Sequence, residues 1–196
     1  MTQKKLNSNR KAFRPYRLLG IDPGTNVLGY AVVEVQAKKK LHIVEMGVVK
    51  MSHFDNPYDK LGKIFERLVA IIKHHRPTAM AVEAPFFGKN VQSMLKLGRA
   101  QGVAIAAGIS QRLEVTEYSP KKIKQSVTGN GNAAKEQVAA MLEMTLQADL
   151  SEQYLDATDA LAAAVCHFYQ TGSALGGRKK YKDWGSFLQD NPDRKG

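Results

Sequence analysis

The chain has 196 residues, 43% of them hydrophobic, which is enough for one domain with a substantial core. No apolar run approaches the roughly 20 residues that cross a bilayer. The first 17 residues are polar and basic without the apolar segment of a secretory signal, so we expect no membrane partner. The single cysteine, Cys166, excludes an internal disulfide and favours the reducing cytoplasm.

The net charge of +11 lies mainly at the two ends of the chain. Residues 1–17 contribute +6, residues 176–196 contribute +3, and residues 18–175 only +2. We therefore expect a basic N-terminal extension (1–17), a folded domain (18–175) and a flexible basic C-terminal tail (176–196). Such ends attract a polyanion at long range, although simple solubilisation explains tails equally well.

The first half of the chain is predicted to begin with an antiparallel meander of three strands, over residues 18–22, 28–36 and 41–50. Apolar residues at helical spacing then predict a helix over 59–75, and residues 79–83 form a short buried strand. A meander followed by alternating helices and strands predicts an α/β fold with a mixed sheet and helices on both faces.

The second half is predicted to contain one strand and four helices, over residues 90–109 (helix), 113–118 (strand), 120–127, 133–146 and 156–171 (helices). Asn132 is the predicted N-cap of the helix at 133–146, and Pro120 suits the first turn of the helix before it. The helix over 90–109 is rich in Gly and Ala. It either packs on the sheet or also meets its own copy in a dimer.

Four carboxylates stand where strands and a helix could bring them together. Asp22 and Glu83 each end an apolar run, and Asp156 and Asp159 lie three apart on one face of an alanine-rich helix. Acids in buried settings are costly unless something pairs with them. We therefore predict that the four bind Mg²⁺, with Mn²⁺ as a substitute, because oxygen-only ligands suit these ions.

Each acid also has a plainer explanation when it is considered alone. Asp156 can be an N-cap and Asp159 a first-turn acid favoured by the helix dipole. Asp22 can be a turn residue of the Asp-Pro-Gly sequence. The joint pattern favours a metal site, because two divalent ions about 4 Å apart can clamp a scissile phosphate.

Several basic residues begin predicted helices, where free N–H groups help to hold a phosphate. They are Lys121, Lys122, Lys124 and Lys135, with exposed surface lysines as the alternative explanation. Phe86 and Phe87 precede Gly88, which indicates a loop where an exposed ring can stack on a base. For Phe87 a core position is favoured. His167 is expected to be hydrogen-bonded and structural.

These motifs resemble the RuvC family of Holliday-junction resolvases over about residues 18–170. The matching segments are Leu19–Thr25 (Leu-Gly-Ile-Asp-Pro-Gly-Thr), Val82-Glu83, Gly98–Gly102 (Gly-Arg-Ala-Gln-Gly), Lys124-Gln125, Lys135 and Asp156–Leu161 (Asp-Ala-Thr-Asp-Ala-Leu), followed by His167. Each segment alone is common, and the combination is specific.

The resemblance implies a ribonuclease H-like fold with a five-stranded mixed sheet. It also implies a homodimer that cuts four-way junction DNA by paired symmetric nicks, in homologous recombination and DNA repair. The nicks leave 5′-phosphate and 3′-hydroxyl ends, two Mg²⁺ ions serve each active site, and a branch-migration complex docks on the enzyme.

The resemblance also assigns roles to residues of this chain. The catalytic and metal-binding positions match Asp22, Glu83, Asp156 and Asp159. The DNA-contacting positions match Phe86, Lys124 and Lys135, and we add Lys89, Lys121 and Lys122 as expected DNA contacts. Phe86 would contact unpaired bases at the crossover. Because Pro85 restricts the residue before it, Phe87 could share this role.

Two other functions fit parts of the sequence. The Asp22–Thr25 segment also resembles the first phosphate loop of actin-like kinases and chaperones, which need two such lobes where this chain has length for one. A non-catalytic DNA-binding module would use the basic ends as its grip and the acids as helix caps. That reading leaves Glu83 unexplained.

Overall fold

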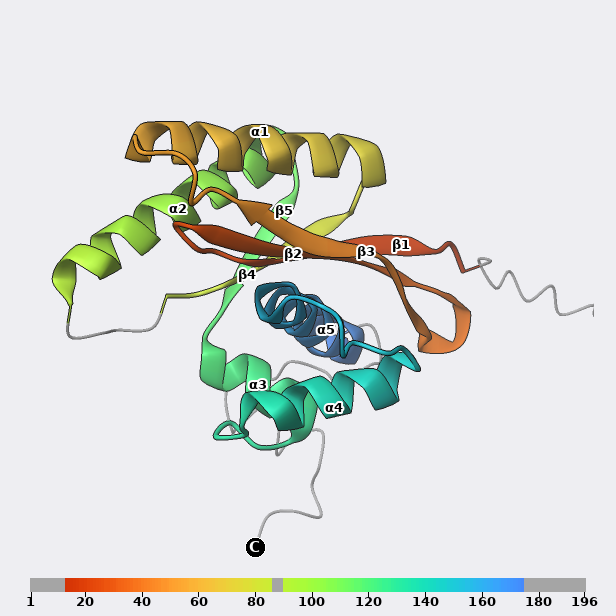
Figure 1. Ribbon diagram of the computed structural model, residues 1–196. Coiled ribbons are helices and arrows are strands. Elements are labelled where there is room, and N and C mark those ends of the chain that lie inside the picture. The colour runs from red at the N-terminus through yellow and green to blue at the C-terminus, as the bar shows by residue number, and fades with distance from the viewer. Residues whose placement is uncertain (1–12, 86–89, 175–196) are drawn as a thin grey trace, which may run out of the picture.

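The computed structural model describes residues 13–85 and 90–174, in which five strands form one mixed sheet (Figure 1). The strands are β1 (Tyr16–Asp22), β2 (Val27–Val35), β3 (Leu41–Lys50), β4 (Ala79–Glu83) and β5 (Glu114–Tyr118). The helices are α1 (Pro57–His75), α2 (Val91–Ser110), α3 (Pro120–Thr128), α4 (Lys135–Leu146) and α5 (Leu155–Ala174), with a short 3-10 turn η1 (Ala37–Lys39).

The strand order is β3-β2-β1-β4-β5. The first three strands pair antiparallel, which confirms the predicted meander. β1 pairs with β4 in parallel, in a register that sets Leu18 against Ala79 and Ile21 against Val82. Both strands therefore end at the same edge of the sheet, where the next residues are Asp22 and Glu83.

Helices cover both faces of the sheet, as predicted. Figure 1 shows α1 and α2 on one face, and α5 on the other with α3 and α4 outside it. Residues alternate between the two cores along each strand. Leu19 and Ile21 of β1 pack with Leu68 of α1, whereas Ala31 and Val33 of β2 pack against α5.

The face of the sheet under α5 is built from small side chains. A methyl group added at Gly20 would overlap the carbonyl oxygen of Ala160, and one at Gly29 would overlap the carbonyl oxygen of Asp156. Ala81 completes this floor from β4. Because these residues have no side chain or only a methyl group, the backbone of α5 lies directly against the strands.

Most predicted bounds agree with the structure to within two residues, but the predicted N-cap of α4 was wrong. The amide of Asn132 donates to the side chain of Asn130, which holds a turn there. The helix begins two residues later than expected, with Ala134 as its N-cap. The amide of Ala134 donates to Gln137 Oε1, so a side chain from within the helix satisfies the exposed N–H.

Among the helices of the described residues, none combines the length and the hydropathy that a membrane-spanning segment requires.

Candidate active site

Asp22 and Glu83 lie side by side at the ends of two parallel strands. Side chains two apart on a strand point to the same face. Gly20 and Ala81 face α5, and so their neighbours two positions onward, Asp22 and Glu83, face α5 as well. The two strand acids are thereby directed toward the first turns of that helix.

The N-terminal part of α5 supplies the other two acids. Asp156 is in its first turn, and the carbonyl group of Asp156 lies against Gly29. Gly29 in turn is the ladder partner of Asp22. The close approach of α5 to the sheet thus brings Asp156, and Asp159 one turn later, over the ends of β1 and β4. Together Asp22, Glu83, Asp156 and Asp159 are called the four acids below.

The four acids lie close enough together to perturb the ionisation of the two strand acids. Burial raises the pKa of Asp22 to about 8, and the charges of Glu83, Asp159 and Asp156 add to this in decreasing order. Burial also raises the pKa of Glu83 to about 7, with a further contribution from Asp159. At neutral pH the site therefore retains protons that isolated carboxyl groups would have lost.

Lys135 is the basic partner that the sequence of α5 does not provide. It is the first residue of α4, and its Nζ lies 2.6 Å from Oδ2 of Asp159. This hydrogen bond raises the pKa of the Lys135 ammonium group. The Lys135 side chain remains 59% exposed against 24% for Asp159, so its charged end stays open to an incoming anion.

A cleft of about 180 Å³ opens at the strand acids. It is lined by Asp22, Pro23, Glu83, Ala84, Pro85, Leu97 and Gln101. The last two come from α2, so the cleft lies between the ends of β1 and β4 and that helix. The predicted DNA contacts Phe86 and Lys89, together with Phe87, fall outside the described residues.

The chemistry of the four acids fits a divalent cation. All the donors are carboxylate oxygens, which are the ligands that Mg²⁺ and Mn²⁺ prefer. A cation would also relieve the repulsion that raises the pKa of Asp22 and Glu83. Within the described ranges, no three acidic, His or Cys side chains are already drawn together as a metal cage. Lys135 instead engages Asp159.

The remaining predicted residues divide into two groups. Lys124 is near enough to lower the pKa of Glu83 and so belongs to the surroundings of the site. Lys121 and Lys122 are exposed on α3, and no interaction among the described residues links them to the four acids. The expected structural role of His167 agrees with its hydrogen bond to the Tyr118 hydroxyl group (3.0 Å) and with a pKa lowered by burial.

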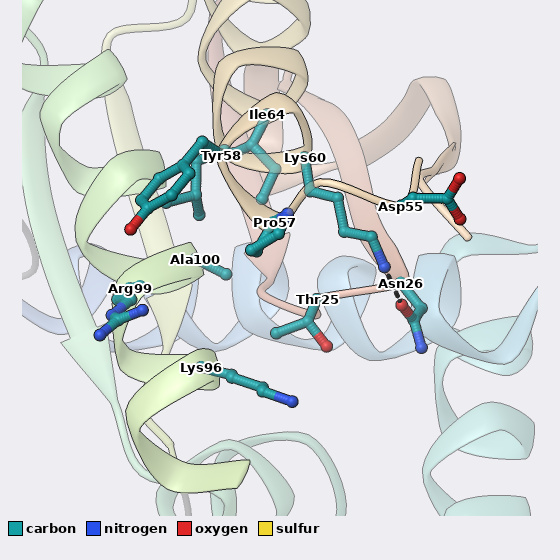
Figure 2. Close-up of a pocket in the computed structure, with 11 residues that line it drawn as sticks. Thr25, Asn26, Asp55, Pro57, Tyr58, Lys60, Ile64, Lys96, Arg99 and Ala100 are labelled. Carbon is teal, nitrogen blue, oxygen red and sulfur yellow. Dashed lines mark hydrogen bonds between the residues drawn. The ribbon is translucent and has the colours of Figure 1, made fainter. Parts of the chain in front are cut away.

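A second, larger pocket of about 270 Å³ was not predicted from the sequence (Figure 2). It is lined by Thr25, Asn26, Asp55, Pro57, Tyr58, Lys60, Leu61, Ile64, Lys96, Arg99 and Ala100, and we call it the cationic pocket. One sequence signal was available, since Lys96 and Arg99 lie three apart and therefore share a helix face.

A protein-family model and several curated relatives match this chain. The family model described as Crossover junction endodeoxyribonuclease RuvC matches residues 18–167. The protein of that name from Christiangramia forsetii is 52% identical over 177 residues, which cover 90% of this chain and 91% of the relative. The corresponding protein from Cytophaga hutchinsonii is 53% identical over 177 residues, covering 90% of this chain and 86% of the relative.

Solved structures agree. Thermus thermophilus RuvC in complex with a Holliday junction substrate matches with a TM-score of 0.76 and 33% identity, over 81% of this chain and 96% of that one. The yeast mitochondrial Holliday junction resolvase Ydc2, at 13% identity and a TM-score of 0.63, covers 83% of this chain and 82% of its own, and it shows the shared fold. The expected ribonuclease H-like fold is thus confirmed, and the chain belongs to the RuvC family of crossover junction endodeoxyribonucleases.

Proposed function

We propose that this protein is a metal-dependent endonuclease that resolves four-way (Holliday) DNA junctions by paired symmetric nicks. Its products would carry 5′-phosphate and 3′-hydroxyl ends, and it would act in the cytoplasm during homologous recombination and DNA repair. The observation that carries the proposal is the electrostatic coupling of Asp22 to the other three acids. Ionisable groups with strongly perturbed pKa values are typical of catalytic sites.

We assign the four acids as ligands of two Mg²⁺ ions, for which Mn²⁺ can substitute. When bound, the two ions would activate a water molecule for in-line attack and stabilise the leaving oxygen of the scissile phosphate. The protein holds the four acids in fixed positions for this chemistry. The strand acids fix one side of the site and the α5 acids the other, on rigid elements whose separation is set by Gly20 and Gly29.

Lys135 contributes a positive charge next to the reacting phosphate. Its ammonium group holds Asp159 in the absence of DNA. Once the acids are neutralised, the same group is free to donate to a phosphate oxygen, because its side chain is more than half exposed. Lys124 adds a second cation near Glu83. Lys121 and Lys122 extend this basic edge along α3 toward the flanking DNA.

The proposal includes a homodimer, because two opposed strands must be cut at a two-fold symmetric junction. The outward face of α2 supports the proposed homodimer. Val91, Leu95 and Ile109 are all more than half exposed, and they follow helical spacing along one stripe. Gly98 and Gly102 lie in the same stripe with open space beside them, so the backbone of a second copy can approach closely.

The predicted loop contacts and partners complete the proposal. Phe86, with Phe87 as its alternative, and Lys89 would meet the bases and backbone at the crossover, on the segment that follows the cleft. The resemblance also implies docking with a branch-migration complex, and we include that partner.

The decisive experiment compares a labelled synthetic four-way junction with linear duplex DNA of the same sequence. We expect Mg²⁺-dependent nicks at symmetric positions in the junction and little cutting of the duplex. A protein that binds the junction and cuts it with neither Mg²⁺ nor Mn²⁺ would be a binding module instead. Turnover of ATP in place of cleavage would assign the chain to the actin-like class.

A further inference from the structure

The cationic pocket and the cleft at the strand acids are lined by neighbouring segments of the chain. Asp22 and Pro23 line the cleft, whereas Thr25 and Asn26, the next residues but one, line the pocket. The two cavities also share α2, which sends Leu97 and Gln101 to the cleft and Lys96, Arg99 and Ala100 to the pocket. The pocket is therefore a neighbour of the cleft, along both the β1–β2 turn and α2.

The charge of the pocket is positive and largely uncompensated. Lys60 comes from α1, and Lys96 and Arg99 come from α2 (Figure 2). Neither Lys96 nor Arg99 forms a salt bridge with a carboxylate of the described residues. Asp55 is the one acid among the lining residues, and Figure 2 shows its carboxylate directed away from all three cations.

Lys60 is also held in place without losing its charge. Its Nζ donates to Oδ1 of Asn26 at 2.7 Å, and an amide oxygen is neutral. The bond ties the first turns of α1 to the β1–β2 turn, which directly follows Asp22. An anion bound in the pocket would therefore have a fixed position relative to β1 and Asp22.

The walls of the pocket suit a sugar attached to that anion. Leu61 and the ring of Tyr58, which is 71% exposed, give the pocket an apolar wall, while Ile64 and Ala100 also line it but are themselves fully buried. An inorganic anion needs no such surface, whereas a deoxyribose between two phosphates buries its carbon atoms against it. The combination of three cations with an apolar wall points to a nucleotide backbone.

We propose that the cationic pocket binds a backbone phosphate of the DNA substrate, a few nucleotides from the scissile phosphate, and so sets the register of the cut strand. The inference rests on the proposed function. Asp22 and Thr25 are three residues apart, so their Cα atoms are separated by at most about 11 Å. One strand carries a phosphate for roughly each 3.4 Å of duplex axis, which corresponds to about three nucleotides.

Phosphate contacts position a protein on DNA and carry no base information. The pocket should therefore contribute affinity and salt dependence and leave the chemical step alone. This separates it from Lys135, whose charge acts on the reacting phosphate itself.

The test uses the double variant Lys96→Ala/Arg99→Ala, in which both altered side chains are exposed. Junction affinity is measured by fluorescence anisotropy without divalent metal over a salt series, and cutting is measured in single turnover at saturating enzyme with Mg²⁺. We expect the slope of log affinity against log salt to become shallower by about one to two, and affinity to weaken roughly tenfold near physiological salt. The saturated cutting rate should stay within about twofold of the parent.

Two matched variants make the result specific. The charge-preserving Lys96→Arg/Arg99→Lys should keep the parental slope. Lys73→Ala removes one charge from the far end of α1 and should change the slope by much less than the double variant. Light scattering confirms that the oligomeric mass is unchanged.

An unchanged salt slope in the double variant, with a parent that cuts junctions, would overturn the pocket and leave the proposed function intact. An equal loss of slope in Lys73→Ala would also overturn it, because the effect would then be general electrostatic attraction. Failure of the parent to cut any junction would remove the proposed function and this inference with it.

Discussion

Charged side chains are paired differently at the two ends of the sheet. At the end where β1 begins, Arg17 pairs with Glu34 of β2 and donates to the carbonyl oxygen of His75. At the end where β1 finishes, four acids gather around one paired lysine, and burial with mutual repulsion raises the pKa of Asp22 to about 8. One end satisfies its charges internally, and the other leaves a deficit of positive charge that a ligand can fill.

This difference in charge pairing identifies the functional site more precisely than the fold does. Folds of this class serve many activities, and the site determines which one is present. A deficit of this kind lowers the stability of the protein alone, so it persists where a bound partner compensates it. The end with the four acids should therefore lose activity and gain stability when its charge is removed, while the paired end should do neither.

The largest effect is expected for neutral replacements among the four acids. Asp22→Asn, Glu83→Gln and Asp156→Asn should each reduce single-turnover junction cutting by about a thousandfold or more, because each removes a proposed metal ligand. Junction binding measured by anisotropy should remain largely intact. Glu34→Gln, at the paired end of the sheet, is the matched control and should cut as the parent does. Parental cutting by Asp156→Asn would remove that residue from the site.

The next largest effect concerns the floor under α5. Gly29→Ala places a methyl group against the backbone of Asp156, so we expect a loss of about 2–3 kcal/mol in the free energy of unfolding. Cutting should also fall by about a hundredfold, because α5 carries two of the four acids. Gly62→Ala, which meets nothing within 4 Å, should be neutral or stabilising in the same denaturant titration. A stable, fully active Gly29→Ala protein would contradict the close approach.

Lys135→Ala should have an intermediate effect. We expect a loss of about ten- to a hundredfold in the saturated cutting rate, since the proposed charge-assisted contact to the phosphate would disappear. Lys135→Arg should recover part of the rate because it retains the charge. A defect confined to affinity, with a normal rate at saturation, would mean that Lys135 contributes to DNA binding and not to the chemical step.

A smaller effect is expected in the pH dependence of stability without metal. The pKa of Asp22 is higher in the folded protein than in the unfolded chain, so the unfolded state binds fewer protons between about pH 4 and pH 8. The free energy of unfolding of the parent should therefore fall as the pH rises through this range. Asp22→Asn should be more stable than the parent by at least about 1 kcal/mol at pH 8 and no more stable near pH 4. Parallel stability curves would contradict the raised pKa of Asp22.

The smallest effect is expected at the paired end. Arg17→Ala removes a partly exposed ion pair with Glu34, and such pairs contribute about 0–1 kcal/mol. Activity should not change. A loss of stability much larger than this would show that the contact with the His75 carbonyl group matters more than the ion pair.

The sequence predicted the placement of the acids because simple periodicities determine it. The apolar runs before Asp22 and Glu83 read as buried strands, and a spacing of three put Asp156 and Asp159 on one helix face. The small residues two positions before each strand acid, Gly20 and Ala81, were a further signal, because they mark the face on which α5 packs.

What the sequence did not predict depends on contacts between distant elements. The ion pair between Lys135 and Asp159 requires α4 to lie beside α5, which no local pattern specifies. The start of α4 was misplaced because two asparagines compete for the turn before it, and Asn130 rather than Asn132 accepts the backbone hydrogen bond. The cationic pocket joins residues from a turn and two helices, so only the folded arrangement reveals it.

The most direct test of the central claim is calorimetric titration of the protein with Mn²⁺ at pH 7, in two buffers with different ionisation enthalpies. If the four acids bind metal and retain protons in its absence, binding should release about one to two protons per chain. Both the binding and the proton release should be largely lost in the double variant Asp22→Asn/Glu83→Gln. Binding without proton release, or binding that survives in this variant, would contradict the account.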